Sequence, residues 1–191
     1  MAKDRIILGI DPGTTIMGYG VIEASGKEPV LITMGIVKLQ KLKDHYLKLR
    51  RIFEETLTII DQYHPDELAI EAPFYGKNVQ SMLKLGRAQG SAISAALYRE
   101  LPIFEYAPRK IKMSITGRGS ASKEQVAGLL KGILRLREVP ANLDATDGLA
   151  AAVCHFYQNR HEGEAPSYKS WKEFIAKNPG RVAAPGDGTG R

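Results

Sequence analysis

Three short apolar runs at the start of the chain constrain its fold most strongly. They are rich in the β-branched and aromatic side chains typical of strands, and they cover residues 5–11, 19–23 and 29–38. Pro12 and Gly13 end the first run, and residues 25–27 form a turn between the other two. Parallel neighbours in a sheet need a crossover of about a dozen or more residues. The three runs therefore predict an antiparallel meander.

The spacing of apolar residues then changes to that of helices, interrupted by two more strand-like runs. Residues 43–63 form an amphipathic pattern that Pro65 closes, and a strand over 67–71 follows. A strand, a helix and a strand in that order imply a right-handed crossover and a parallel pairing. Similar patterns predict a fifth strand over 103–106 and helices over 79–100, 122–136 and 144–157. The predicted fold class is α/β, with a five-stranded mixed sheet, strands 1–3 antiparallel, strands 4 and 5 parallel to strand 1, and helices on both faces.

The composition excludes several classes of protein. With a single cysteine, Cys154, in 191 residues, the chain can form neither a disulfide framework nor a zinc cluster of thiolates. No run approaches the roughly 18 apolar residues of a membrane span, and residues 1–5 lack the layout of a signal peptide. We expect a cytoplasmic protein without a membrane partner. One domain is predicted over residues 1–159, followed by a partly ordered tail over 160–191 with an anchoring patch at Trp171, Phe174 and Ile175.

Basic residues are concentrated in one segment. The whole chain has a net charge of +6, whereas residues 107–137 alone hold eight lysines and arginines against one acid, Glu124. A concentrated basic surface is typical of proteins that bind a polyanion, although a solvated helical face has the same composition. The segment therefore predicts a polyanionic partner only in combination with other features.

Four acidic residues fall where the predicted fold brings elements together. Asp11 ends the first strand and Glu71 ends the fourth, and parallel neighbours end at the same edge of a sheet about 4.8 Å apart. Asp144 and Asp147 are three residues apart, and so lie on one face of the last helix. Individually, Asp11 could be a turn residue before Pro12, and Asp144 an acid at a helix N-terminus. Together they predict a cluster of carboxylates.

Such a cluster suggests a metal-dependent chemistry. Four adjacent carboxylates repel one another unless they are protonated or neutralised by cations. Two Mg²⁺ ions would balance the charge, and carboxylate oxygens are ligands that Mg²⁺ prefers. A pair of such ions activates water and stabilises the leaving oxygen of a phosphodiester. The residues therefore predict metal-dependent phosphodiester hydrolysis.

An ordered set of motifs resembles the RuvC family of Holliday junction resolvases from about residue 6 to 157. The matching segments are residues 7–13, 18–20, 71–74, 84–90, 117–121 with Lys123, and 144–150. The resemblance implies an RNase H-like fold, a homodimer, and symmetric nicking of four-way DNA junctions in recombination and repair. It also implies two Mg²⁺ ions per active site, with Mn²⁺ as a possible substitute, and a RuvA–RuvB-type branch-migration partner.

The same motifs imply roles for individual residues. By match to the family pattern, the catalytic acids and metal ligands would be Asp11, Glu71, Asp144 and Asp147, although some members carry His at the position of Asp144. The predicted DNA-binding residues are Phe74, Lys112, Arg118 and Lys123. Lysines at such positions neutralise phosphate without reading sequence. Phe74 could stack on an unpaired base at the junction centre or cap the core, and the adjacent Tyr75 is a second candidate.

Small residues form a stripe on the second predicted helix. Gly86, Gly90 and Ser94 recur every four residues and would allow close backbone approach. The approaching surface could be the sheet or a second copy of the chain. Two symmetric nicks need two active sites, which a twofold dimer provides.

Three other functions are compatible with parts of this pattern. The Asp-Pro-Gly-Thr-Thr segment also resembles the first phosphate loop of the actin and sugar-kinase superfamily, but 191 residues are too few for its second lobe. The YqgF-type nuclease-like family shares the fold and the acids, and the segments around Phe74 and Arg118 argue against it. A junction-binding protein without catalysis would gain nothing from four clustered acids, because they weaken DNA binding.

Overall fold

The computed structural model describes residues 4–26, 28–74, 78–140, 142–162 and 175. Contacts divide the chain into a compact unit of residues 1–159 and a second unit of residues 160–191. Most of the predicted tail, including Trp171 and Phe174 of its anchoring patch, lies outside the described residues. Among the helices that are described, none combines the length and the apolar character needed to cross a membrane.

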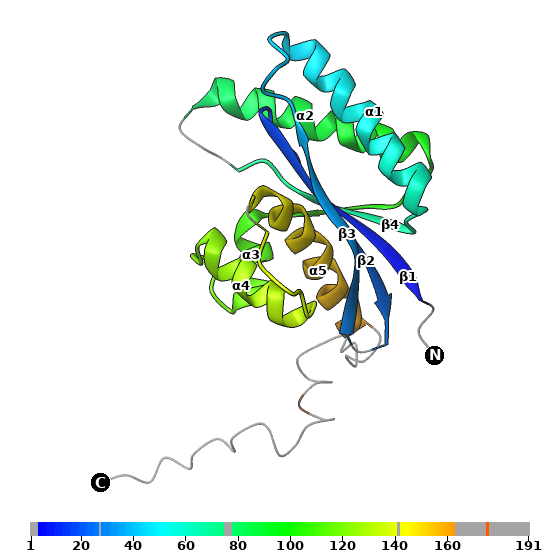
Figure 1. Cartoon of the computed structure of the whole chain (residues 1–191), viewed down its shortest axis with the longest axis vertical. Helices are drawn as coiled ribbons and strands as arrows, with labels where there is room; N and C mark the ends of the chain where they lie inside the picture. The colour runs from blue at the N-terminus through cyan, green and yellow to red at the C-terminus, as the bar shows by residue number, and fades with distance from the viewer. Residues whose placement is uncertain (1–3, 27, 75–77, 141, 163–174, 176–191) are drawn as a thin grey trace, which may run out of the picture. The chain divides into compact units, whose positions relative to one another are not determined.

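The sheet has five strands in the order β3-β2-β1-β4-β5 (Figure 1). The strands are β1 (Arg5–Asp11), β2 (Ile16–Ser25), β3 (Glu28–Lys38), β4 (Glu67–Glu71) and β5 (Ile103–Tyr106). β2 pairs antiparallel with β1 and with β3, whereas β4 pairs parallel with β1 and with β5. The predicted mixed sheet is confirmed. β2 is longer than the apolar run that predicted it, because it keeps pairing with both neighbours beyond that run.

Within the described residues, five helices connect and cover the strands. They are α1 (His45–Tyr63), α2 (Val79–Tyr98), α3 (Pro108–Thr116), α4 (Lys123–Ile133) and α5 (Asp144–Glu162). Ser122 and Gln125 form the expected capping box of α4. The sequence pattern did not predict α3, because its nine residues show too little apolar periodicity to be distinguished from a loop. Pro108 at the first helical position and Gly117 in the left-handed conformation at the end are its start and stop signals.

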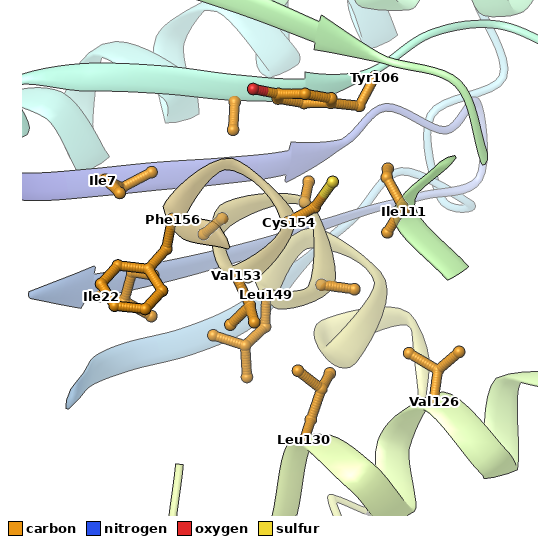
Figure 2. Packing of buried hydrophobic residues seen from close by; sticks show 14 of the residues in the cluster. Ile7, Ile22, Tyr106, Ile111, Val126, Leu130, Leu149, Val153, Cys154 and Phe156 are labelled. Carbon is orange, nitrogen blue, oxygen red and sulfur yellow. The ribbon is translucent and has the colours of Figure 1, made fainter. Parts of the chain in front are cut away.

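Helices cover both faces of the sheet, as predicted. Consecutive strand residues point to opposite faces, so Leu8 packs in the cluster with Ile52 of α1, whereas Ile7 packs in the cluster with Leu149 of α5. α1 and α2 lie on one face, and α3, α4 and α5 lie on the other (Figure 1). Figure 2 shows α5 between the strands and α4, with Leu149 near Leu130 of α4. α5 is therefore the central helix of its layer.

Glycines bring α5 unusually close to the sheet. A Cβ atom added to Gly18 of β2 would lie 1.9 Å from the carbonyl oxygen of Asp144, and one added to Gly9 of β1 would lie 2.1 Å from that of Gly148. A Cβ on Gly148 would in turn lie 2.6 Å from the carbonyl oxygen of Gly18. Backbone therefore meets backbone at this contact. Since Gly18 is the residue paired with Asp11, the contact fixes the first turn of α5 beside the end of β1.

Candidate active site

Two acidic residues lie side by side at the ends of neighbouring strands. Ile10 of β1 pairs with Ile70 of β4 in parallel register, and Asp11 and Glu71 are the next residues on the two strands. Both strands are buried up to this point, and both carboxyl residues are half-buried. The parallel register predicted from the crossover therefore places these carboxylates at one edge of the sheet.

α5 brings two further acids to this edge. Asp144 and Asp147 lie in its first turn, and the Gly18 contact holds that turn against the strand beside Asp11. The Asp144 backbone N–H donates to Oδ1 of Asn142 at 2.9 Å, which partners one of the free amides at the helix start. The Asp147 side chain is 15% exposed and that of Asp144 is 35% exposed. Asp147 thus faces the interior of the site and Asp144 its rim.

The buried acids repel one another electrostatically. Burial, followed by the charge of Asp147, raises the pKa of Asp11 to about 6. Burial, followed by the charge of Asp11, raises the pKa of Glu71 to about 8. Burial also raises the pKa of Asp147, although Lys123 opposes this shift. The three carboxylates therefore lie close enough to repel one another, and a cation bound among them would be attracted by all three.

Lys123 is the counter-charge within the protein. Its Nζ donates to Oδ1 of Asp144 at 3.2 Å and to Oδ2 of Asp147. Burial lowers the pKa of the Lys123 ammonium, but these two bonds outweigh it and raise the pKa overall. With the side chains in this arrangement, no three Asp, Glu, His or Cys residues of the described segments form a group that could hold a metal ion. The donor set still fits a hard divalent cation, because it consists of carboxylate oxygens that already hold one ammonium.

The acids open into a cleft that also contains positive charge. The cleft has a volume of about 440 Å³, and its lining includes Asp11, Glu71 and Asp147 together with Phe74, Arg109, Lys112 and Lys123. The charges of Lys123 and Lys112 oppose the rise in the pKa of Glu71, so both lysines lie close enough to interact with the acids. Carboxylates that can bind cations lie here next to lysine side chains that can bind phosphate oxygens. Such a site is suited to a phosphodiester.

Comparisons with known proteins agree on one family. The family described as crossover junction endodeoxyribonuclease RuvC matches residues 7–155. A crossover junction endodeoxyribonuclease RuvC from Christiangramia forsetii is 60% identical over 182 residues, which are 95% of each chain. Another from Bacteroides fragilis is 63% identical over 182 residues, 94% of this chain and 97% of the relative. This chain belongs to the RuvC family of crossover junction endodeoxyribonucleases.

Solved RuvC structures share its fold. The structure of T. thermophilus RuvC in complex with a Holliday junction substrate has a TM-score of 0.77 and 31% identity, and the match covers 83% of this chain and 96% of that one. The yeast mitochondrial Holliday junction resolvase Ydc2 has a TM-score of 0.60 at 13% identity, with 90% of this chain and 83% of that chain covered. At that identity the second likeness is one of fold. The predicted RNase H-like resolvase fold and RuvC family membership are confirmed.

The structure gathers most of the residues predicted for this RuvC site. Asp11, Glu71, Asp147, Phe74, Lys112 and Lys123 all line the cleft, and Asp144 reaches it through its bond to Lys123. Arg118 is the exception, because it lines a separate hollow with Gln125 and Leu129. Tyr75 lies outside the described residues.

Two alternatives left open by the sequence are decided by burial. Phe74 is 69% exposed, so the interpretation of it as a core cap is wrong. The stripe of Gly86, Gly90 and Ser94 does not pack on the sheet: a Cβ on either glycine would meet no atom within 4 Å, and Ser94 is exposed. The buried residues of α2 are instead Ala88, Gln89, Ala92, Ala95 and Ala96.

Two residues of the site were missed by the sequence analysis. Arg109 lines the cleft, and a Cβ on Gly119 would lie 2.5 Å from its Cγ, so the glycine leaves room for the arginine. Gln89 is buried, and its Nε2 donates to the carbonyl oxygen of Glu71 at 3.4 Å and to Oε2 of Glu105 at 2.7 Å. A polar residue on the apolar face of α2 was the signal for Gln89. Gly119 in a basic segment was the signal for Arg109.

Proposed function

We propose that this chain resolves four-way DNA junctions by hydrolysing one phosphodiester bond per subunit in the cleft between β1, β4 and α5. The observation that carries this proposal is the convergence of acids from three separate elements beside Lys112 and Lys123. A RuvC relative of this chain has been solved with a Holliday junction substrate, which supports the choice of DNA. The site residues proposed to act are Asp11, Glu71, Asp144 and Asp147.

Two Mg²⁺ ions are proposed to be held by these four carboxylates. When bound, such a pair activates a water and stabilises the leaving 3′ oxygen of a phosphodiester, and Mn²⁺ could replace it. The carboxylate of Glu71 needs a cation to be mostly ionised at neutral pH, because burial and the charge of Asp11 raise its pKa to about 8, whereas Asp11, with a pKa of about 6, is already mostly ionised there. Gln89, through its bond to the Glu71 carbonyl, positions the end of β4.

The basic and aromatic residues of the cleft are proposed to hold the DNA. Lys112 neutralises phosphate beside the acids. Lys123 does the same once cations take over the oxygens of Asp144 and Asp147 to which it now donates. Phe74, exposed at the mouth of the cleft, offers an aromatic face to an unpaired base. Arg118 lies outside the cleft, so its proposed contact is with a phosphate further along an arm.

We further propose that two copies pair through one face of α2. The residues Val79, Leu83, Gly86, Gly90 and Leu97 recur at intervals of three, four or seven residues and so share that face. The apolar members Val79, Leu83 and Leu97 are 63%, 53% and 60% exposed, and the glycines leave open space between them. A small-residue stripe flanked by exposed apolar side chains suits close helix-to-helix packing, and a twofold dimer would supply two active sites.

A direct assay tests the proposed function. The protein is incubated with a synthetic four-way junction and with a linear duplex of the same sequence, each with and without Mg²⁺, and the nicks are mapped. We expect paired, symmetric nicks only in the junction and only with Mg²⁺. Junction binding without nicks in any metal would instead indicate a binding protein, and equal cutting of the linear duplex would contradict structure specificity. Adding a RuvA–RuvB-type complex to the same assay tests whether such a partner alters the cutting.

A further inference from the structure

A second basic groove lies outside the cleft and outside residues 107–137. Its lining consists of Lys38, Lys41, Leu42, Leu47, Arg50, Arg51 and Glu54, and its volume is about 330 Å³. Four of these seven residues are cationic and one is acidic. The proposed chemistry of the acids, Lys112 and Lys123 does not use this groove.

The groove begins at the same edge of the sheet as the proposed active site. β3 runs parallel to β1 with β2 between them, so both strands end at this edge, β1 with Asp11 and β3 with Lys38. Gly18 of β2 pairs with Asp11 on one side and with Ile36 on the other. Two strand spacings separate the ends of β1 and β3, which amounts to about 10 Å. A polymer that crosses this edge of the sheet can therefore reach both sites.

Hydrogen bonds tie the groove to the loop that follows Asp11. The backbone N–H of Leu39 donates to the carbonyl oxygen of Thr15 at 2.9 Å, and Nζ of Lys48 donates to that of Thr14 at 2.9 Å. Leu39 follows Lys38 directly, and Lys48 lies in α1 between the groove residues Leu47 and Arg50. The groove is thus held at a fixed place relative to the end of β1.

Three of the four cations of the groove are available to an external anion, because Arg51 is held by Glu55 in an ion pair at 2.5 Å. Lys38 and Lys41 are exposed, and neither forms an ion pair within the part of the chain that the structure describes. Arg50 pairs with Glu54 at 3.4 Å and is 70% exposed on its side chain, so that pair is weak and easily exchanged. Unpaired lysines around a hollow are suited to phosphate contacts that do not depend on base sequence.

We propose that this groove binds the phosphodiester backbone of one duplex arm of the junction. The inference rests on the proposed function, and extends it from the cutting site to an arm-holding site. A duplex places one phosphate per strand every 3.4 Å or so, which makes the separation of about 10 Å equal to roughly three base pairs. Lys112 and Lys123 line the cleft with the acids, and Lys38 and Lys41 line the groove at the end of β3, so an arm that reaches both sites meets positive charge at each.

Salt dependence provides the first test. Binding of wild-type protein, Lys38→Gln and Lys41→Gln to a four-way junction is measured without Mg²⁺ over a range of salt concentrations. Each lysine that neutralises one phosphate contributes about 0.9 to the slope of log K against log salt, so each variant should lose about that amount per bound subunit. The control is Arg99→Gln, which removes one positive charge at the opposite edge, where Arg99 bonds Asp61. Its slope should equal that of wild type.

Neutral phosphate analogues provide the decisive test. Pairs of methylphosphonate linkages are stepped along the arms, and affinities are measured for wild type and for the double variant Lys38→Gln/Lys41→Gln. If the lysines contact those phosphates, one position on an arm weakens wild-type binding but causes no further loss in the double variant. Additive losses at every position, or slopes unchanged from wild type, would overturn the inference, and a groove that serves an acidic protein partner would give that result.

The nicking assay separates this inference from the proposed function. At saturating protein with Mg²⁺, the control Arg99→Gln should nick the junction as fast as wild type, whereas the double variant should need more protein to reach the same rate, because its hold on the arm is weaker. Melting temperatures close to that of wild type establish that the four variants are folded. Wild-type protein that never nicks a junction contradicts the proposed function, whereas normal nicking with unaltered arm contacts contradicts only the arm-binding groove.

Discussion

Asp11 shows how one side chain can limit stability and still be required for function. Its carboxylate is buried at the end of β1 in the field of Asp147, which raises its pKa to about 6. A group in that position is unfavourable in the free protein and favourable once a cation arrives. A substitution that removes the charge of Asp11 is therefore expected to raise stability and to lower activity.

Replacing Asp11 with Asn should separate the two. We expect Asp11→Asn to abolish nicking, since a metal ligand is lost, and to leave junction binding intact or stronger, since negative charge near phosphate is removed. In chelator the variant should also unfold at a higher temperature. Its free energy of unfolding should rise by about 1 kcal/mol, because the repulsion between the carboxylates is relieved. Thermal melts and gel-shift assays measure both effects, and a clear drop in melting temperature would indicate a structural role instead.

Glu71 should make the metal-free protein less stable as pH rises. Its folded pKa of about 8 lies above the ordinary glutamate pKa of 4.5, so the folded state binds more protons between these values. The contribution of this group is fully present below about pH 4.5 and is lost as pH rises toward 8. In chelator, the melting temperature of wild type relative to Glu71→Gln should fall across this window. A constant difference between the two proteins would place Glu71 in a solvated environment.

Lys112 should act on DNA through charge alone. Lys112→Ala is expected to weaken binding to a similar degree for junctions of different sequence, and to reduce the salt slope by about 1 per bound subunit. Affinities measured at several salt concentrations on two junction sequences test this. An unchanged slope would place the side chain away from phosphate.

At the scale of elements, the placement of α5 depends on glycine. Gly18 of β2 and Gly148 of α5 let the helix backbone touch the sheet, and this contact carries Asp144 and Asp147 to the strand ends. A side chain on either residue must move the helix, and the acids with it. The distance between helix and sheet is thus part of the site.

Gly18→Ala should therefore impair activity beyond its cost in stability. Its Cβ would lie 1.9 Å from the Asp144 carbonyl oxygen, so we expect a loss of about 1–3 kcal/mol or more and a large loss of nicking in the fraction that remains folded. Gly128→Ala in α4 is the matched control, because its Cβ meets nothing within 4 Å. Removing that helical glycine should stabilise the protein by about 0.5–1 kcal/mol. Denaturant titrations and nicking rates at a temperature where both variants are folded compare them.

At the scale of the whole molecule, function is proposed to need two copies. Leu83→Asp, on the exposed face of α2, should give a monomer in sedimentation experiments, because a charge would be buried at the pairing surface. The monomer should lose coordinated nicking of the two strands while single nicks persist. Val30→Asp is the control, since Val30 is 51% exposed on β3, away from α2. A Leu83→Asp monomer that still cuts both strands together would contradict the dimer.

The sequence by itself determined the sheet order of β1, β2 and β3, the parallel pairing of β4, and the edge at which Asp11 and Glu71 meet. These features follow from local rules, because short connections allow only antiparallel neighbours and a helical crossover allows only a parallel one. The spacing of Asp144 and Asp147 placed both on one face of the last helix, and the family motifs assigned them a role as catalytic acids. α3 was missed because a short helix in a basic segment has too little apolar periodicity to distinguish it from a loop.

Only the tertiary structure decided how closely these parts approach. The bond from Lys123 to Asp144, the cleft position of Arg109, the open face of α2 and the groove beside Lys38 all depend on contacts between segments far apart in the chain. Local patterns show which face of an element is apolar, but they carry no information on which other element covers it. Packing against the rest of the molecule makes that choice.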